Sequence, residues 1–189
     1  MKKPPELWLA RHAPVLAEKG LCYGVSDLPA GETATLQAAK ALAARLPEGW
    51  PVYASPLRRC QQLARSLRAL RPDLSFDDDL RLRELDFGAW EGRLWTAIER
   101  AEFDAWLADF AHNCPGGGES VASLMARVGQ AWDDWQAKGV GTLWITHAGV
   151  MRAAVLLSRG TRMPATAAGW PSADMPHEQV LILQGSGSG

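Results

Sequence analysis

The chain lacks an excess of charge of either sign. Its 20 Lys and Arg residues stand against 21 Asp and Glu residues, which gives a formal net charge of -1 at pH 7. Proteins that bind nucleic acid without sequence preference neutralise many phosphates with basic side chains, and this composition does not supply such a surface. The sequence therefore argues against nucleic acid as a general partner.

The chain also lacks a long apolar run. A membrane-spanning helix needs roughly 18 or more consecutive apolar residues, and no segment approaches that length. The apolar stretch that follows Met1–Pro5 is too short for a secretory signal. We therefore expect a soluble, cytoplasmic protein with no membrane partner.

Cysteine is scarce. Cys22, Cys60 and Cys114 are odd in number and widely spaced, with neither a CxxC pair nor the spacing of metal ligands. This pattern argues against a disulfide framework and against a metal centre. We expect three reduced thiols without a catalytic role.

Apolar residues are abundant, at 47% of the 189 residues, and they include nine tryptophans that we expect mostly in the core. A chain of this length buries roughly 70% of the surface that its unfolded form exposes, which is enough for one sizeable core. No internal repeat or linker divides the chain. We expect a single domain over residues 1–184, followed by a Gly/Ser tail, 185–189, that resembles an artificial linker.

Short strand-like segments alternate with longer helix-like segments, a pattern typical of a layered α/β domain. The strand-like segments are Leu7–Ala10, Val52–Ala54, Thr142–Ile145 and Val180–Leu183. The helix-like segments, with apolar residues at three- and four-residue steps, are Leu57–Leu70, Leu94–Phe110 and Val121–Trp135. We expect the segment from Leu94 to form a helix that covers one end of the sheet.

Basic and imidazole groups follow three of the expected strands, where open α/β sheets bind ligands. The residues at these ends are Arg11-His12, Ser55-Pro56-Leu57-Arg58 and Thr146-His147-Ala148-Gly149. Ser55 suits a helix N-cap, and Pro56 suits a first turn, so Arg58 is expected in that turn with its guanidinium near the helix amino end. Because the arginine fork matches phosphate oxygens, the combination predicts a phosphate pocket. Taken alone, a histidine after a strand is more often a hydrogen-bonded structural residue, and an exposed arginine is usually a solvated charge.

Five motifs stand in order along the chain: Arg11-His12, Ser55–Cys60, Leu82–Gly92, Pro115–Ser120 and Thr146–Gly149. Together they resemble the histidine phosphatase superfamily. The resemblance implies the phosphoglycerate-mutase-like fold, a three-layer α/β/α arrangement around a mostly parallel open sheet. Segment Gly20–Pro29 is similar to the bacterial subgroup of α-ribazole-phosphate phosphatases of cobalamin assembly, although relatives with this segment include general phosphatases.

The resemblance also implies roles for single residues. His12 is expected to attack phosphorus and to form a covalent phosphohistidine, which water then hydrolyses. Arg11, Arg58 and His147 are expected to stabilise the negative charge on the phosphoryl oxygens. Glu84 is expected to donate a proton to the departing oxygen and later to act as the base toward water. Tyr23 and Ala148 are expected to contact the substrate, a small phosphate monoester. The resemblance implies no metal and no cofactor.

Several nearby residues receive other interpretations. The resemblance places Glu91 in a structural Trp-Glu-Gly turn. Gly116–Gly118 lack the Lys-Ser/Thr of a P-loop, so we expect a mobile loop near the pocket. His112 and His177 match no motif, and we expect solvated or structural roles. Ala13 stands where the family usually has Gly or Thr, which leaves the contacts at the pocket entrance open.

Three alternatives to the α-ribazole-phosphate reading stay open at this point. The first is a broad-specificity phosphatase, and the second is a phosphoglycerate-type mutase, which usually carries larger insertions than this chain has. The third is a non-catalytic phosphate-binding module, a class that Ala13 keeps open. The sequence also leaves the oligomeric state open, a homodimer included.

Overall fold

The computed structural model describes residues 4–164, 166–177 and 179–185. In the described residues, five strands form one sheet and five α-helices pack around it or beyond its edge. The strands are β1 (Glu6–Arg11), β2 (Pro51–Ala54), β3 (Ser75–Asp78), β4 (Thr142–Thr146) and β5 (Val180–Gln184). The helices are α1 (Glu32–Ala43), α2 (Arg58–Leu70), α3 (Arg100–Ala108), α4 (Val121–Lys138) and α5 (Ala148–Ser158). Residues 186–189 of the expected tail lie outside the described residues.

The sheet has the strand order β3-β2-β4-β1-β5. All neighbouring pairs are parallel except β5, which runs antiparallel to β1. This confirms the mostly parallel open sheet of the expected fold. The expected strands omitted β3, because its sequence Ser75-Phe76-Asp77-Asp78 offers one apolar side chain at an edge of the sheet.

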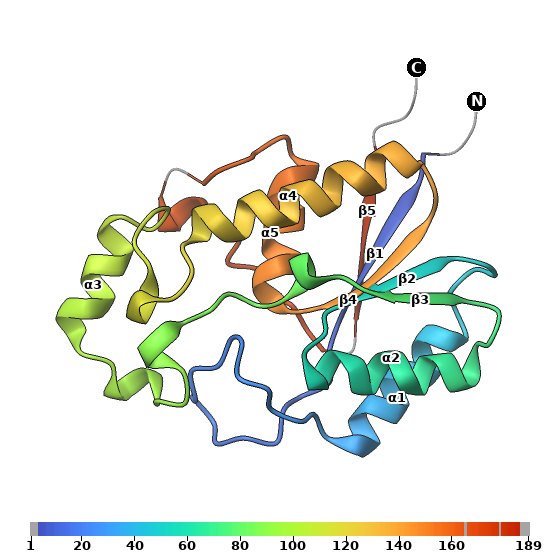
Figure 1. Ribbon diagram of the computed structural model, residues 1–189, viewed down its shortest axis with the longest axis horizontal. Coiled ribbons are helices and arrows are strands. Elements are labelled where there is room, and N and C mark those ends of the chain that lie inside the picture. The colour runs from blue at the N-terminus through green and yellow to red at the C-terminus, as the bar shows by residue number, and fades with distance from the viewer. Residues whose placement is uncertain (1–3, 165, 178, 186–189) are drawn as a thin grey trace.

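Helices cover both faces of the sheet, α4 and α5 on one side and α1 and α2 on the other (Figure 1). The period of two along β1 divides its apolar side chains between these layers. Leu7 and Leu9 pack in the core with α4 and α5. Trp8 and Ala10 pack in the opposite core, with α1 and α2. One strand therefore anchors both layers.

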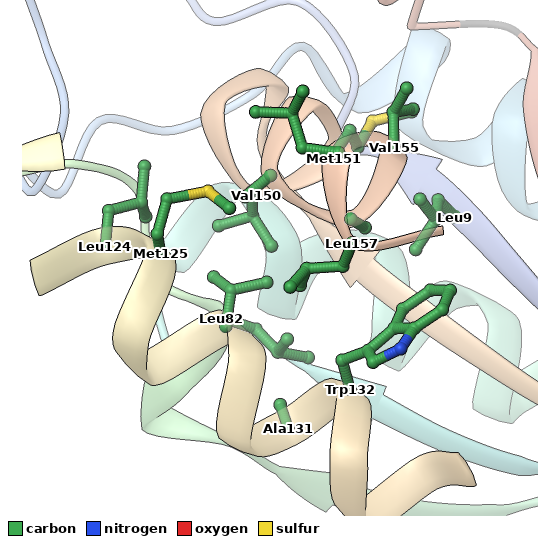
Figure 2. Close-up of a cluster of buried hydrophobic side chains, with 14 of the residues drawn as sticks. Leu9, Leu82, Leu124, Met125, Ala131, Trp132, Val150, Met151, Val155 and Leu157 are labelled. Atoms are coloured by element: carbon green, nitrogen blue, oxygen red, sulfur yellow. The ribbon is translucent and has the colours of Figure 1, made fainter. Parts of the chain in front are cut away.

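Helix α4 has sequence signals at both ends. The Ser120 hydroxyl accepts a hydrogen bond from the Ser123 N–H at 3.1 Å, and Gly139, at φ 63°, ends the helix in the left-handed region. Between them runs the buried apolar stripe that the spacing predicted. Figure 2 shows Met125 and Trp132 from this stripe in the core shared with α5 and β1.

The segment from Leu94 to Phe110 is not one helix. It forms a short 3-10 turn at Trp95–Ala97 and then α3, because Ile98 and Glu99 adopt extended backbone conformations between them. Helix α3 lies beyond the sheet, at the left of Figure 1. Phe103 and Trp106 pack there against a small separate core formed by Cys22, Trp90 and Ile98.

None of the helices in the described part of the chain has the length and apolar composition that a membrane crossing requires.

Removing a core side chain of β1 is expected to destabilise the protein strongly. Leu9 is fully buried, so Leu9→Ala should lower the free energy of unfolding by about 2–5 kcal/mol through lost burial and a residual cavity. Leu16, at 67% exposure, is the matched control, and Leu16→Ala should change that free energy by no more than about 0.5 kcal/mol. Urea denaturation of both variants tests this, and equal losses would contradict the core described above.

Candidate active site

The pairing of β1 with β4 sets two histidines side by side. Arg11 stands opposite Thr146 in the parallel register, so the next residues, His12 and His147, leave the same edge of the sheet together. The His12 N–H donates to the Thr146 carbonyl at 3.2 Å, and the two imidazole centroids lie 5.2 Å apart. The structure therefore brings together the two expected histidines.

Arg59 lies between these rings. Its Nε–H donates to His12 Nε2 and to His147 Nδ1, both at 3.3 Å. Its Nη1 donates to the Ser26 carbonyl at 2.8 Å, and its Nη2 donates to the Gly24 carbonyl. Arg59 is fully buried, and all three nitrogens of its guanidinium have acceptors.

Tyr23, expected to bind substrate, is part of this group because its ring lies 5.3 Å from the guanidinium carbon of Arg59. A cation this close to an aromatic face is attracted by the ring quadrupole. Tyr23 therefore covers the arginine that lies between the histidines.

Arg58, the expected phosphate ligand, is not in this group. It is exposed, and its backbone N–H donates to the Asp27 carboxylate at 2.6 Å. Helix α2 begins at Arg58 with Leu57 as its N-cap residue, so Ser55 does not cap it. Arg59 was missed, although the spacing could have indicated it: Arg59, Leu63 and Leu67 follow at four-residue steps on the buried face of α2.

His12 is held neutral with its reactive nitrogen defined. The ring Nδ1–H donates to the Ala13 carbonyl at 2.7 Å, which leaves the lone pair on Nε2. Burial is the largest cause that lowers the pKa of His12 well below 6.5; the bond to Ala13 opposes it, and the charges of Arg59 and Arg11 add to it. The contact uses a backbone carbonyl, so replacing Gly or Thr by Ala13 does not remove it.

His147 is also held neutral, by different contacts. Its Nδ1 accepts from Arg59, so Nε2 carries the proton and donates to the Ser55 hydroxyl at 2.8 Å. Burial first, and then the Arg59 charge, hold the pKa of His147 well below 6.5. Cys60 Sγ lies 3.5 Å from Nε2, and burial raises the pKa of this thiol, which keeps it protonated.

Glu84 lies at the amino end of α5, where His147 is the N-cap residue and Ala148 the buried first residue. Its carboxylate accepts the Leu85 N–H at 3.0 Å and the Gly149 N–H at 3.1 Å. A Cβ atom at Gly149 would lie 2.3 Å from Glu84 Oε1, so this approach requires glycine. The expected proton donor is thus joined to the His147 end of the site.

Segment 171–177, which we call the strap, is bonded to the site. Arg11 Nη1 donates to the Met175 carbonyl at 2.8 Å, and Arg152 Nε donates to the Pro171 carbonyl at 2.9 Å. His177 Nδ1 donates to the His12 carbonyl at 2.5 Å, and the two rings lie 5.4 Å apart. His177 therefore contacts the predicted nucleophile, a position that no sequence motif indicated.

Arg11 retains one unused donor, because its buried Nε has no hydrogen-bond partner among the described residues. His12 and His147 are each only 1% exposed. A phosphate ester therefore reaches His12 Nε2 only when neighbouring groups move.

Glu91 supports the site from behind. Its carboxylate accepts the backbone N–H groups of Gly24, Val25, Ser26 and Phe87 at 2.9–3.1 Å. Burial alone would raise the pKa of Glu91, but these bonds and the one from the Ser26 hydroxyl outweigh it and lower the pKa. Glu91 thus fixes the turn whose carbonyls hold Arg59, a structural position like the one that the resemblance implied.

Two other sequence expectations have different outcomes. His112 is exposed and pairs with Asp109 at 3.2 Å, as expected of a solvated residue. Gly116–Gly118 do not form a free loop: a Cβ atom at Gly118 would lie 2.2 Å from the Asp86 carbonyl oxygen, and one at Gly116 would lie 2.3 Å from that of Phe87. These glycines allow backbone to pack on backbone, and the mobility expected of this loop stays a prediction.

The arrangement combines a lone pair on His12 Nε2, cationic donors from Arg11 and Arg59, and the carboxyl group of Glu84. These groups suit attack on an anionic phosphoryl group followed by proton transfer. No group of three or more His, Cys, Asp or Glu side chains in the described part of the chain is placed to hold a metal ion.

Several solved structures share the fold of this chain. Among solved structures, Mycobacterial hydrolase 2 matches 96% of this chain and 82% of its own with a TM-score of 0.80 at 24% identity. TTHB049 from Thermus thermophilus matches 82% of this chain and 85% of its own with a TM-score of 0.64 at 33% identity. The mycobacterial glucosyl-3-phosphoglycerate phosphatase Rv2419c matches 82% of this chain and 80% of its own with a TM-score of 0.70 at 24% identity.

Curated relatives match a shorter region. The Bifunctional protein Rv2228c of Mycobacterium tuberculosis is 43% identical over 88 residues, which are 43% of this chain and 23% of that protein. The chain thus spans less than a quarter of this relative's length. The model of the Histidine phosphatase superfamily (branch 1) matches residues 7–175, a range that contains His12, Arg59, Glu84 and His147. The chain therefore belongs to the histidine phosphatase superfamily, branch 1.

Proposed function

We propose that this protein is a phosphomonoesterase that transfers a phosphoryl group to His12 Nε2 and then to water. The observation that carries the proposal is the state of His12: its Nδ1–H is fixed on the Ala13 carbonyl, burial keeps the ring neutral, and Nε2 faces Arg59. A neutral nitrogen with a defined lone pair is what nucleophilic attack on phosphorus requires. Membership of the histidine phosphatase superfamily supports the same reaction.

In the first step the hydrogen bond from Arg59 Nε–H to His12 Nε2 breaks, the freed lone pair of Nε2 forms a bond to phosphorus, and the bond from phosphorus to the ester oxygen breaks. Glu84 enters this step as a protonated carboxyl group, gives its proton to the departing oxygen and becomes a carboxylate, and the product alcohol leaves. In the second step water attacks phosphorus while Glu84 takes the water proton, the bond between nitrogen and phosphorus breaks, and His12 is neutral again. The cycle leaves phosphate and restores both side chains.

Cationic donors stabilise the charge that develops on the phosphoryl oxygens. We assign this role to Arg11, whose buried Nε has no other partner among the described residues, and to Arg59. Arg59 takes the place first expected of Arg58. His147 lies against the same Arg59 nitrogen, within reach of the same oxygens.

The substrate that we propose is a small phosphate monoester, and α-ribazole 5'-phosphate is the first candidate because of segment Gly20–Pro29. The name of one structural relative points to a different ester, glucosyl-3-phosphoglycerate. Release of inorganic phosphate from both esters, and from phosphoglycerates and nucleotides, distinguishes a dedicated enzyme from a broad one.

A phosphohistidine on residue 12 is the expected intermediate. Brief reaction with a phosphate monoester labelled in its phosphoryl group should yield an acid-labile, base-stable adduct on His12. The His12→Ala variant should form no adduct and should lose activity by about a thousandfold or more. Rapid quench with peptide mapping provides the measurement. Anion binding without adduct or hydrolysis in the wild type would instead favour a non-catalytic phosphate-binding module.

Neighbouring arginines on α2 provide a matched test of the charge assignment. Arg59→Met removes the cation between the histidines and should lower kcat/KM by about a hundredfold to a thousandfold. Arg58→Met removes an exposed cation and should lower kcat/KM by no more than about threefold. Thermal unfolding of both variants separates lost folding from lost chemistry. A larger loss of activity in Arg58→Met than in a folded Arg59→Met would refute the assignment.

The pH dependence follows from the lowered pKa of His12. Because the neutral ring is favoured, the nucleophile stays available as the pH falls through 6.5, where an ordinary histidine is half protonated. We expect kcat/KM to remain level from pH 7.5 to below pH 6.5 and to fall only at lower pH. The measurement should use an aryl phosphate with an electron-withdrawing group. Its own second ionisation lies at low pH, and its aryl oxide departs without a proton from Glu84, so the profile reports His12. A decline centred at or above pH 6.5 would contradict the neutral nucleophile.

A further inference from the structure

A cavity of about 420 Å³ adjoins the proposed phosphate site. This volume lies within the range of pockets that bind small molecules and exceeds what a phosphoryl group fills. Its walls come from segment 84–110, from the first turns of α4 and α5, and from the residues around the start of the strap. The cavity therefore lies where an ester's alcohol part could extend from the phosphate.

One end of this cavity is polar and belongs to the site already described. Glu84 and Gly149 line it, and they are joined by the hydrogen bond from the Gly149 N–H to Glu84 Oε2. Arg152, one turn farther along α5, also lines it and donates to the Pro171 carbonyl. Glu84 is the group that we assign to protonate the departing oxygen, so the cavity begins where that oxygen leaves.

The remaining wall is aromatic. Five rings line it, and adjacent rings meet with centroids 5.2–6.3 Å apart, mostly edge to face. They are Phe87, Trp95, Trp106, Phe110 and Trp170. Leu85, Val121 and Leu124 complete the apolar lining.

Phe110 is buried in the main core, but the other four rings keep exposed surface. Trp95 is 37% exposed, and Trp106 and Trp170 are partly exposed, whereas Trp90, Trp132 and Trp144 are buried. Apolar aromatic surface left in contact with water gains free energy when a ligand covers it, and a flat ring gains most because it can pack edge to face or stacked.

We propose that this cavity binds the alcohol part of the substrate and selects phosphate monoesters whose alcohol carries a flat aromatic ring close to the phosphate. Trp95 and Trp170 are the specificity-determining residues, and both contact that ring. The inference rests on the proposed function, because the polar end of the cavity is assigned through Glu84. It extends that function by naming the substrate class.

Two ligands that differ only in the ring test the cavity directly. 2-Phenylethylphosphonate and ethylphosphonate carry the same anionic group and neither can be hydrolysed, so calorimetric titration of the purified chain measures binding alone. The aromatic ligand should bind about 10- to 100-fold more tightly. Trp170→Ala and Trp95→Ala should each weaken the aromatic ligand by about fivefold or more and leave ethylphosphonate within about twofold.

Trp50→Ala is the matched control. This tryptophan is also partly exposed, but it packs beside Trp8 on the opposite face of the sheet, so its loss should leave both affinities unchanged. Equal affinity of the wild type for the two phosphonates overturns the proposal, as does equal weakening of both ligands in Trp170→Ala and Trp95→Ala. Tighter or equal binding of 2-cyclohexylethylphosphonate overturns the selection of a flat ring.

Hydrolysis of 2-phenylethyl phosphate and ethyl phosphate separates this inference from the proposed function. Both esters release a primary alcohol, so their chemistry is matched and kcat/KM should follow the binding preference. Hydrolysis of both at equal kcat/KM would refute the cavity's role while leaving the phosphatase intact. Absence of hydrolysis would refute the phosphatase, and the phosphonate affinities would still decide whether the cavity selects aromatic ligands.

Discussion

The buried charge of Arg59 is the constraint on which the site depends. A guanidinium removed from water is costly unless its donors are satisfied, and here the acceptors are two carbonyls and two imidazole nitrogens. The carbonyls come from the turn at Gly24–Ser26, which Glu91 fixes through its backbone N–H groups. A carboxylate that touches no substrate thus positions the cation, and the cation in turn helps to keep both histidines neutral.

The pairing of strands β1 and β4 positions the two histidines that contact Arg59. Parallel strands end at one edge, and the pairing of Arg11 with Thr146 places the residues that follow them at the same height. Helix α2 starts beyond β2 and contributes Arg59 from its first turn. Three segments that lie far apart in the chain therefore converge, and each functional side chain lies within one or two residues of the end of a strand or the start of a helix.

The sequence was sufficient to predict the mostly parallel sheet and the meeting of His12 with His147, because each histidine stands two positions after an apolar run and strand ends are local signals. It misplaced the arginine by one position, because Ser55 and Pro56 suggested an earlier helix start than the one at Arg58. The buried stripe through Leu63 and Leu67 indicates the right arginine, because Arg59 lies four residues before Leu63 on the same face of the helix. The place of His177 had no local signal at all, since it contacts the backbone carbonyl of a residue 165 positions away. Edge strand β3 was missed because three of its four residues are polar and exposed, so its sequence has no apolar run to indicate a strand.

In the proposed reaction, substrate entry and charge stabilisation both involve the hydrogen bond from Arg11 to the Met175 carbonyl. The histidines and Arg59 are almost inaccessible, and Arg11 Nη1 is occupied by the Met175 carbonyl of the strap. An anionic phosphoryl oxygen is a stronger acceptor than a neutral carbonyl, so an arriving ester competes for that donor. In the proposed reaction, exchange of this bond would release Met175 and free Arg11 Nη1 for the phosphoryl group. The strap contacts Arg152 and the aromatic cavity wall through Pro171, so a ligand that fills the cavity acts on the same segment that covers the nucleophile. If the cavity binds the alcohol part of the ester as proposed, the binding energy of that part is available to open the path to His12, and small esters without it would lack this contribution.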